Sequence, residues 1–204
     1  MLETVYTIGY AGFAIEDFLA VLQDCGISAL VDVRSSPFSS FHQAYNRDGL
    51  AQALGARHIH YRSYAREFGA RQTDRQYYNA QHYLDFEAFA RSEPFLNGVQ
   101  KLKNGMDQGF RFALMCAETD PIDCHRAILV ARAFSGQGYP VVHLCPKGRT
   151  LTHKELELRL LDRYFPDRNQ CSMFAAAQDE AALLAEAYRL RNAEIGYRIQ
   201  EDET

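Results

Sequence analysis

The chain has 204 residues, a formal net charge of −4, and hydrophobic and charged contents of 47% and 24%. These values are ordinary for one globular domain, which can bury enough apolar surface to fold without disulfides or a structural metal. The negative charge argues against a protein that coats nucleic acid by bulk electrostatics. No apolar run approaches the roughly 18 residues of a membrane span and no secretory leader opens the chain, so we expect a cytoplasmic protein with no membrane partner.

The first part of the chain predicts a strand, a helix and a second strand. Residues 4–10 are rich in β-branched and aromatic side chains, apolar residues recur at helical spacing over 15–22, and residues 29–34 form a second apolar run that ends in charge. A strand–helix–strand unit of this length joins parallel strands. The next predicted elements are a loop at 35–40, a short helix at about 48–54, a third strand at 57–61 and a long loop to about 74.

The rest of the chain continues the alternation. Helices are predicted near 86–90 and 94–102, strands at 110–116 and 140–145, and a helix that opens at Pro121 between these strands. The pattern predicts a three-layer α/β fold with a mostly parallel, five-stranded, Rossmann-like sheet. We expect an α/β core domain over 1–150 and a C-terminal helical extension with an acidic tail over 151–204.

Polar and ionisable residues gather where the predicted strands end. Ligands bind outside the carboxyl ends of strands in open parallel sheets, so these residues predict one site at that edge. The candidate residues are Gly9 and Tyr10 after the first strand, Asp32, Arg34 and Ser36 after the second, Cys116 and Glu118 after the fourth, and Cys124, His125 and Arg126 on the following helix start.

The helix start predicted at Pro121 gives this site its chemistry. Free N–H groups and the helix dipole stabilise anions and push a nearby thiol toward thiolate. Cys116 or Cys124 is therefore a candidate nucleophile, and His125 a group that could move protons near neutral pH. Catalysis could further use Glu118 or Asp32 as acid or base.

Two arginines are the candidate anion ligands. Arg34 and Arg126 could each hold a phosphate or carboxylate through paired hydrogen bonds. The structural alternative for Arg126 is an ion pair with Asp32 or Glu118. Gly9, Tyr10 and Ser36 complete the predicted substrate-binding set at this edge.

The five cysteines match no common signature. A phosphatase-type loop needs an arginine six residues after its cysteine, but positions 122, 130 and 151 are Ile, Val and Leu. A Cys-x-x-Cys motif is absent, and the eight-residue separation of Cys116 and Cys124 leaves a regulatory disulfide open. The structural alternative is that the cysteines, including Cys25, Cys145 and Cys171, are reduced core residues.

A zinc site is the other reading of the same residues. It would draw on Cys116, Cys124 and either His125 or His143, but the close pairs typical of structural zinc are missing. We therefore predict no cofactor, and a metal ion stays open as the less favoured alternative.

The segment 57–75 is basic, with five arginines against Glu67 and Asp74. Arg62 and Arg66 stand among Tyr61, Tyr64 and Phe68, and arginines interleaved with aromatic residues can pair with phosphates and stack on bases. Nucleic acid is therefore a candidate partner; the alternative is a solvated loop whose aromatic side chains pack underneath.

Three motifs together resemble the DUF488 family of bacterial and archaeal proteins. They are Thr7-Ile-Gly-Tyr10, then Asp32-Val-Arg34 with Ser36-Pro37, then Cys116-Ala-Glu118 with Asp120-Pro121 and Cys124-His-Arg126. The resemblance runs over about residues 4–148. It implies an α/β domain and a shared polar site made of these residues, but no activity, since the family is named for its unknown function.

The leading functional hypothesis is a hydrolase or group transferase that acts on a small phosphate-bearing, nucleotide or nucleic-acid-like substrate. Two alternatives stay open. One is a non-catalytic module that binds nucleic acid through 57–75, and the other is a thiol-redox sensor that uses Cys116 and Cys124. The oligomeric state is not predicted.

Overall fold

The structure is a computed structural model that describes residues 2–168 and 179–200. Its six-stranded sheet has the order β3-β2-β4-β1-β5-β6. The strands are β1 (Val5–Gly9), β2 (Ala29–Asp32), β3 (His60–Ser63), β4 (Phe112–Cys116), β5 (Val141–Leu144) and β6 (Thr150–Thr152). Strands β1 to β5 pair in parallel, whereas β6 is antiparallel to β5. The predicted α/β fold with a mostly parallel sheet is therefore confirmed.

Two details of the predicted strands were wrong. β6 was missed because three residues with partly exposed side chains carry no readable period, so the sheet has six strands instead of five. The third strand lies over His60–Ser63 instead of 57–61. Residues 57–59 do not join the sheet, because their N–H groups cap the preceding helix; Ile59, for example, donates its N–H to the carbonyl of Leu54 at 3.0 Å.

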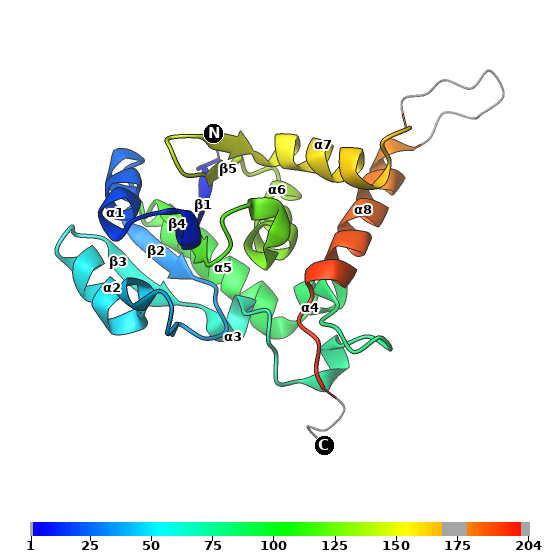
Figure 1. The fold of residues 1–204 in the computed structure, drawn as a ribbon, viewed down its shortest axis with the longest axis horizontal. Helices are drawn as coiled ribbons and strands as arrows, with labels where there is room; N and C mark the ends of the chain where they lie inside the picture. The colour runs from blue at the N-terminus through cyan, green and yellow to red at the C-terminus, as the bar shows by residue number, and fades with distance from the viewer. Residues whose placement is uncertain (1, 169–178, 201–204) are drawn as a thin grey trace.

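Helices cover both faces of the sheet, as a three-layer fold requires (Figure 1). On one face α1 (Ile15–Asp24) and α2 (Arg47–Gly55) pack on the side chains of Ile8, Leu30 and Met115. The other face carries Val5, Val31 and Leu114, because successive residues of a strand point to opposite faces. Its helices are α5 (Glu93–Asp107), a π-helix (Arg126–Ala131) and α6 (Arg132–Ser135), with short α3 (Ala65–Phe68) and α4 (Phe86–Ala90) nearby.

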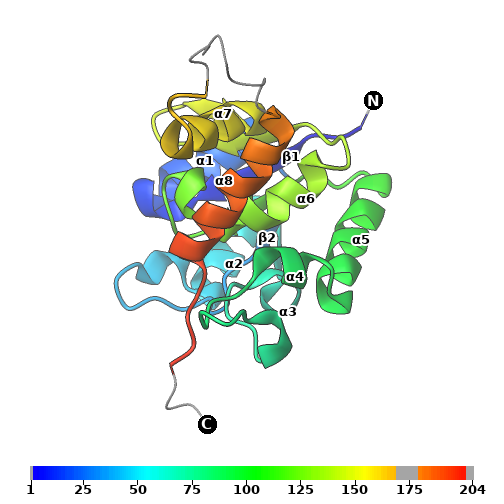
Figure 2. The same cartoon turned by 90° about the vertical axis from the view of Figure 1, so that its right-hand side faces the viewer.

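The C-terminal helices belong to the same packed body as the sheet. Leu156 and Leu160 of α7 (His153–Tyr164) and Tyr188 of α8 (Glu180–Ile195) lie in one buried cluster with Val5 and Val141. Figure 2 shows α8 running from α7 toward α4. The division into a core domain over 1–150 and a helical extension over 151–204 stays a prediction. Cys171 and the end of the acidic tail, residues 201–204, lie outside the described residues. Among the residues that the structure describes, no helix is long and apolar enough to cross a membrane.

A buried chain of hydrogen bonds ties these helices to the sheet. Thr7 Oγ1 lies 2.8 Å from His143 Nδ1, and His143 Nε2 lies 3.1 Å from His153 Nδ1. His153 Nε2 is 2.9 Å from the Tyr188 hydroxyl, which donates to Glu157 at 3.0 Å. Every member is satisfied when both imidazoles are neutral and each donates to the next group. The two histidines therefore have a structural role in the core.

Candidate functional site

A cavity of about 510 Å³ opens beside the carboxyl ends of β1, β2 and β4. The connections that leave β1 and β4 run to opposite sides of the sheet, so this is the switch point at which open α/β sheets bind ligands. We call it the site cavity. Half of the twelve residues proposed from the sequence line it, and these are Tyr10, Arg34, Ser36, Cys116, Glu118 and His125.

Arg34 is held at the wall of the site cavity by a buried ion pair. Its Nη2 donates to Asp32 Oδ2 at 2.6 Å, its Nε to Oδ1 at 2.9 Å, and its backbone N–H to Oδ1 at 3.0 Å. The Tyr61 hydroxyl donates to the same carboxylate at 2.6 Å. Asp32 is fully buried and does not line the site cavity, so its contacts position Arg34.

One nitrogen of Arg34 is left over. Nη2 also donates to the Tyr45 carbonyl at 2.9 Å, but buried Nη1 has no acceptor within hydrogen-bonding distance among the described residues. The guanidinium lies 5.2 Å from the Tyr10 ring centre, and Tyr10 stacks on Tyr45 at 4.4 Å. An unpaired donor on a buried cation is costly, and an anion in the site cavity would satisfy it.

The segment after β4 is not the single helix predicted from Pro121. Pro121–Asp123 forms one 3₁₀ turn, capped by the Asp120 side chain, which accepts from the Ile122 N–H at 3.1 Å. Cys124 is then extended, with φ −136° and ψ 135°, before the π-helix begins at Arg126. Cys124 therefore lies ahead of a helix start instead of inside the first turn, and the Arg126 N–H donates to its sulfur at 3.4 Å.

This extended residue brings two thiols and one imidazole together. His125 Nδ1 lies 3.9 Å from Cys116 Sγ and 4.0 Å from Cys124 Sγ. His125 Nε2 lies 2.9 Å from the Val33 carbonyl oxygen. We call Cys116, Cys124 and His125 the thiol–imidazole cluster.

Within the cluster the pKa values of the two thiols shift in opposite directions. A hydrogen bond with Cys124, together with burial, raises the pKa of Cys116 well above its usual value. Burial also opposes ionisation of Cys124, but the hydrogen bond from Cys116 and the charge of Arg126 outweigh it and hold the pKa of Cys124 well below normal. These opposite shifts are those expected when the Cys116 thiol donates a hydrogen bond to the Cys124 thiolate.

Arg126 does not line the site cavity and instead holds the loop after β4 in place. It is fully buried, and its Nη1 donates to the Glu118 carbonyl at 2.7 Å. Gly9 lets this loop lie close to β1, because a Cβ there would stand 1.7 Å from the same carbonyl oxygen and 2.9 Å from Arg126 Nη2. Anion binding by Arg126 and Gly9 stays a prediction that this geometry does not favour.

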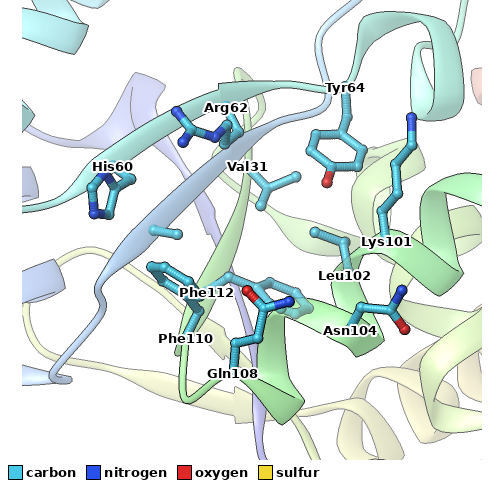
Figure 3. A pocket seen from close by; sticks show the side chains of 12 residues that line it. Val31, His60, Arg62, Tyr64, Lys101, Leu102, Asn104, Gln108, Phe110 and Phe112 are labelled. Atoms are coloured by element: carbon cyan, nitrogen blue, oxygen red, sulfur yellow. The ribbon is translucent and has the colours of Figure 1, made fainter.

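Arg62 and Arg66 lie elsewhere. Figure 3 shows Arg62 beside a second cavity of about 350 Å³, together with His60, Tyr64 and Lys101. Arg66 lines another hollow along α5. Neither cavity shares a lining residue with the site cavity. Arg62 and Arg66 therefore belong to a surface separate from the site cavity, although Arg71 of the same basic segment lines that cavity.

The sequence reasoning missed the contribution of the C-terminal segment and of Arg71. Ile195 and Tyr197 line the site cavity, and the Arg71 guanidinium stacks 4.6 Å from the Tyr197 ring centre. The backbone of Tyr197 is pinned by the Leu84 N–H, which donates to its carbonyl at 3.0 Å. The five arginines of the basic segment were a signal for Arg71, whereas nothing local marked Tyr197.

The C-terminal helices also hold the turn that precedes Cys124. Arg191 of α8 is buried, donates from Nε to the Ile122 carbonyl at 2.9 Å, and pairs with Asp123. Arg159 of α7 pairs with Asp120 at 2.6 Å. Burial raises the pKa of Asp120, but its hydrogen bonds from Arg159 and Ile122 outweigh burial and lower it.

Fold and site together define an α/β protein with a cavity at the switch point of a mostly parallel sheet, lined by a guanidinium, a carboxyl, a thiol and an imidazole. The chain belongs to the DUF488 family, described as a domain of unknown function, whose model matches residues 14–133. The match includes the segments around Asp32 and Cys116–Arg126 but ends before α7, and the Thr7–Tyr10 motif lies outside it. No curated protein and no solved structure matches the chain.

Proposed function

We propose that the protein is an enzyme that hydrolyses, or transfers a group from, a small phosphate-bearing, nucleotide-like substrate bound in the site cavity. The observation that carries the proposal is the unpaired Nη1 of Arg34, a residue that is 5% exposed. Arg34 lines the same cavity as Glu118 and two members of the thiol–imidazole cluster, Cys116 and His125. A preorganised cation beside nucleophilic and proton-transferring groups is what such reactions require.

The walls of the site cavity suit a substrate with a planar part. Tyr10 and Tyr197 line it, and Phe38 stands at it with 71% of its surface exposed. Arg71 adds a second cation beside Tyr197. Aromatic faces stack on nucleobases, while arginines pair with phosphate.

Each reacting role falls to a group at the cavity. Arg34 binds the anion, and Glu118, exposed at the cavity, moves the proton. The attacking group comes from the thiol–imidazole cluster, either a thiolate or a water molecule held there.

Anion binding is tested by calorimetric titration with inorganic phosphate and a panel of nucleoside mono- and diphosphates. We expect Arg71→Gln to weaken binding, and the double variant Asp32→Asn/Arg34→Gln, which leaves no buried charge unpaired, to abolish it. Arg62→Gln, at the cavity of Figure 3, is the matched control and should bind normally. Unchanged binding in the double variant would refute the assignment of Arg34.

Turnover is tested on the ligands that bind. Glu118→Gln keeps the size of the side chain but cannot exchange a proton, so we expect ligand binding without product formation. Full activity of Glu118→Gln would refute its role, and binding without turnover by the wild-type protein would refute catalysis.

A nucleic-acid-binding module is the alternative favoured by one observation, the exposed Arg62 beside Tyr64 at the sheet edge (Figure 3). It predicts binding of oligonucleotides that weakens steeply with salt and is lost in Arg62→Gln/Arg66→Gln. Loss of oligonucleotide binding in Asp32→Asn/Arg34→Gln alone would instead favour the site cavity.

A further inference from the structure

The thiol–imidazole cluster has the composition of a metal site. Its two sulfurs and one ring nitrogen all lie within 4.8 Å of one another. Cys116, Cys124 and His125 are 3%, 1% and 8% exposed, so these three groups share one enclosed space. Thiolate sulfur and imidazole nitrogen are the ligands that zinc prefers in proteins.

The orientation of the imidazole fits a ligand. A carbonyl oxygen can only accept, so Nε2 of His125 carries the hydrogen that is donated to Val33 at 2.9 Å. Nδ1 is then the nitrogen with the free lone pair, and it faces both sulfurs. Histidines that bind metals usually donate their other N–H to a carbonyl or carboxylate in this way.

The spacing is close to that of a tetrahedral site. Zinc bonds of about 2.3 Å to sulfur and about 2.0 Å to nitrogen place neighbouring ligand atoms about 3.5–3.8 Å apart. The sulfur-to-nitrogen distances of 3.9 and 4.0 Å would need to contract by only a few tenths of an ångström. All three ligand atoms lie within 4.8 Å of one another, so the two sulfurs also need to move closer together on binding.

The surroundings suit two thiolates. Arg126 is fully buried next to the cluster, and its backbone N–H donates to Cys124 Sγ at 3.4 Å. Two buried thiolates without a counter-ion would carry a large desolvation cost, which a divalent cation removes.

One coordination position would be open. Cys116 and His125 line the site cavity, Cys124 lies behind them, and exposed Glu118 lines the same cavity. Three protein ligands with a vacant fourth position distinguish catalytic zinc sites from closed structural ones.

We propose that Cys116, Cys124 and His125 bind one zinc ion whose fourth position opens into the site cavity beside Glu118. The ion-binding site stands on this geometry alone; its chemical role rests on the proposed function. There, a zinc-bound water gives a proton to Glu118, and its oxygen forms a bond to the electrophilic atom of the substrate. The bond to the leaving group breaks, and the leaving group takes the proton from Glu118.

The test measures zinc without any substrate. Full-length protein is stripped with a chelator under reducing conditions and titrated with zinc or cobalt(II). We expect about one equivalent of zinc per chain by elemental analysis, as in mononuclear zinc sites. Cobalt(II) should give visible bands of a tetrahedral centre and a near-ultraviolet sulfur-to-cobalt charge-transfer band.

Matched variants identify the ligands. Cys116→Ser, Cys124→Ser and His125→Ala should each weaken zinc binding at least tenfold and change the cobalt spectrum. Cys145→Ser is the control, because the Cys145 thiol is half-buried and donates to the His143 carbonyl at 3.7 Å, outside the cluster. Cys145→Ser should bind both metals as the wild-type protein does.

A measurement on the unaltered chain guards against variants that fail to fold. Prolonged iodoacetamide labelling reaches buried thiols through local opening of the fold. Mapped by mass spectrometry over time, it should show that zinc slows the modification of Cys116 and Cys124 but not of Cys145. Equal labelling with and without zinc, or a Cys116–Cys124 disulfide that zinc does not prevent, would overturn the metal site. Absence of zinc with intact anion binding would overturn this inference alone, whereas bound zinc without anion binding would overturn the proposed function alone.

Discussion

His125 Nδ1 lies 3.9 Å from Cys116 Sγ, although the two residues come from different elements. Cys116 ends β4, whereas His125 caps the π-helix that leads back along the sheet. The short 3₁₀ turn at Pro121–Asp123 and extended Cys124 between them reverse the chain so that both sulfurs meet the ring. The chemistry of the site therefore depends on how firmly this turn and the framework around the cavity are held.

The Asp32–Arg34 ion pair should be essential for stability. Asp32→Asn leaves the Arg34 guanidinium buried without its counter-charge, and such a loss costs about 3–5 kcal/mol. Urea unfolding measures the change. Glu87→Gln is the control, because Glu87 and Arg132 form a partly exposed pair at 3.3 Å that should contribute only about 0–1 kcal/mol. Equal effects of the two substitutions would contradict the buried pair.

Acid should destabilise the fold through the buried histidines. Burial lowers the pKa of His143 well below normal and that of His153 to about 4. The unfolded chain takes up these protons near pH 6.5, whereas folded His153 takes up its proton only near pH 4 and the pKa of folded His143 is also well below normal. Stability is therefore full above about pH 6.5 and falls as the pH drops below it. Each histidine contributes a slope of up to about 1.4 kcal/mol per pH unit.

Unfolding free energies from pH 7.5 to 4.5 check this dependence. His153→Gln removes one titrating group, so its profile should be flatter than that of the wild-type protein. His82→Gln is the control, because His82 is exposed and lies outside this chain of hydrogen bonds, and the slope should not change. A wild-type profile as flat as that of His153→Gln would refute the assignment.

Gly9 should be irreplaceable for a steric reason. In Gly9→Ala the new Cβ would stand 1.7 Å from the Glu118 carbonyl oxygen, so β1 and the loop after β4 must move apart. We expect a loss of about 1–3 kcal/mol, as for other overpacked sites, and weaker ligand binding in the site cavity. Gly105→Ala is the control, because Gly105 lies inside α5 with open space around its Cβ position; it should stabilise the protein by up to about 1 kcal/mol. Thermal unfolding of both variants gives the comparison.

Arg191 should connect the C-terminal helix to the site. Arg191→Met removes its bonds to the Ile122 carbonyl and to Asp123, which we expect to cost about 2 kcal/mol. It should also weaken zinc binding about tenfold by loosening the turn that carries Cys124, as loss of an outer-shell support does. Arg189→Met is matched on the same helix, where Arg189 is exposed and pairs with Glu186, and should leave both properties unchanged. An equal loss in the two variants would show that the effect comes from helix α8 in general.

The sequence by itself determined the edge of the sheet at which the site would lie. The apolar runs that became β1, β2, β4 and β5 end in Tyr10, Asp32, Cys116 and Cys145, and parallel strands deliver their carboxyl ends to one edge. This placement needs only the period of the strands and the polarity of the residues after each strand, and both are local properties.

Only the tertiary structure decided which of these side chains face the cavity. Asp32 pairs with Arg34 and accepts from Tyr61 of the neighbouring strand, and Arg126 donates to the Glu118 carbonyl, because buried charged groups need hydrogen-bond partners. The sequence spacing of Cys116 and Cys124 argued against zinc because close-pair rules describe ligands within one loop, whereas here the end of a strand and a later turn meet. Tyr197 lines the cavity from the segment after α8, more than sixty residues beyond the end of the family match. The packing of the C-terminal helices brings it there, and no local sequence pattern encodes that packing.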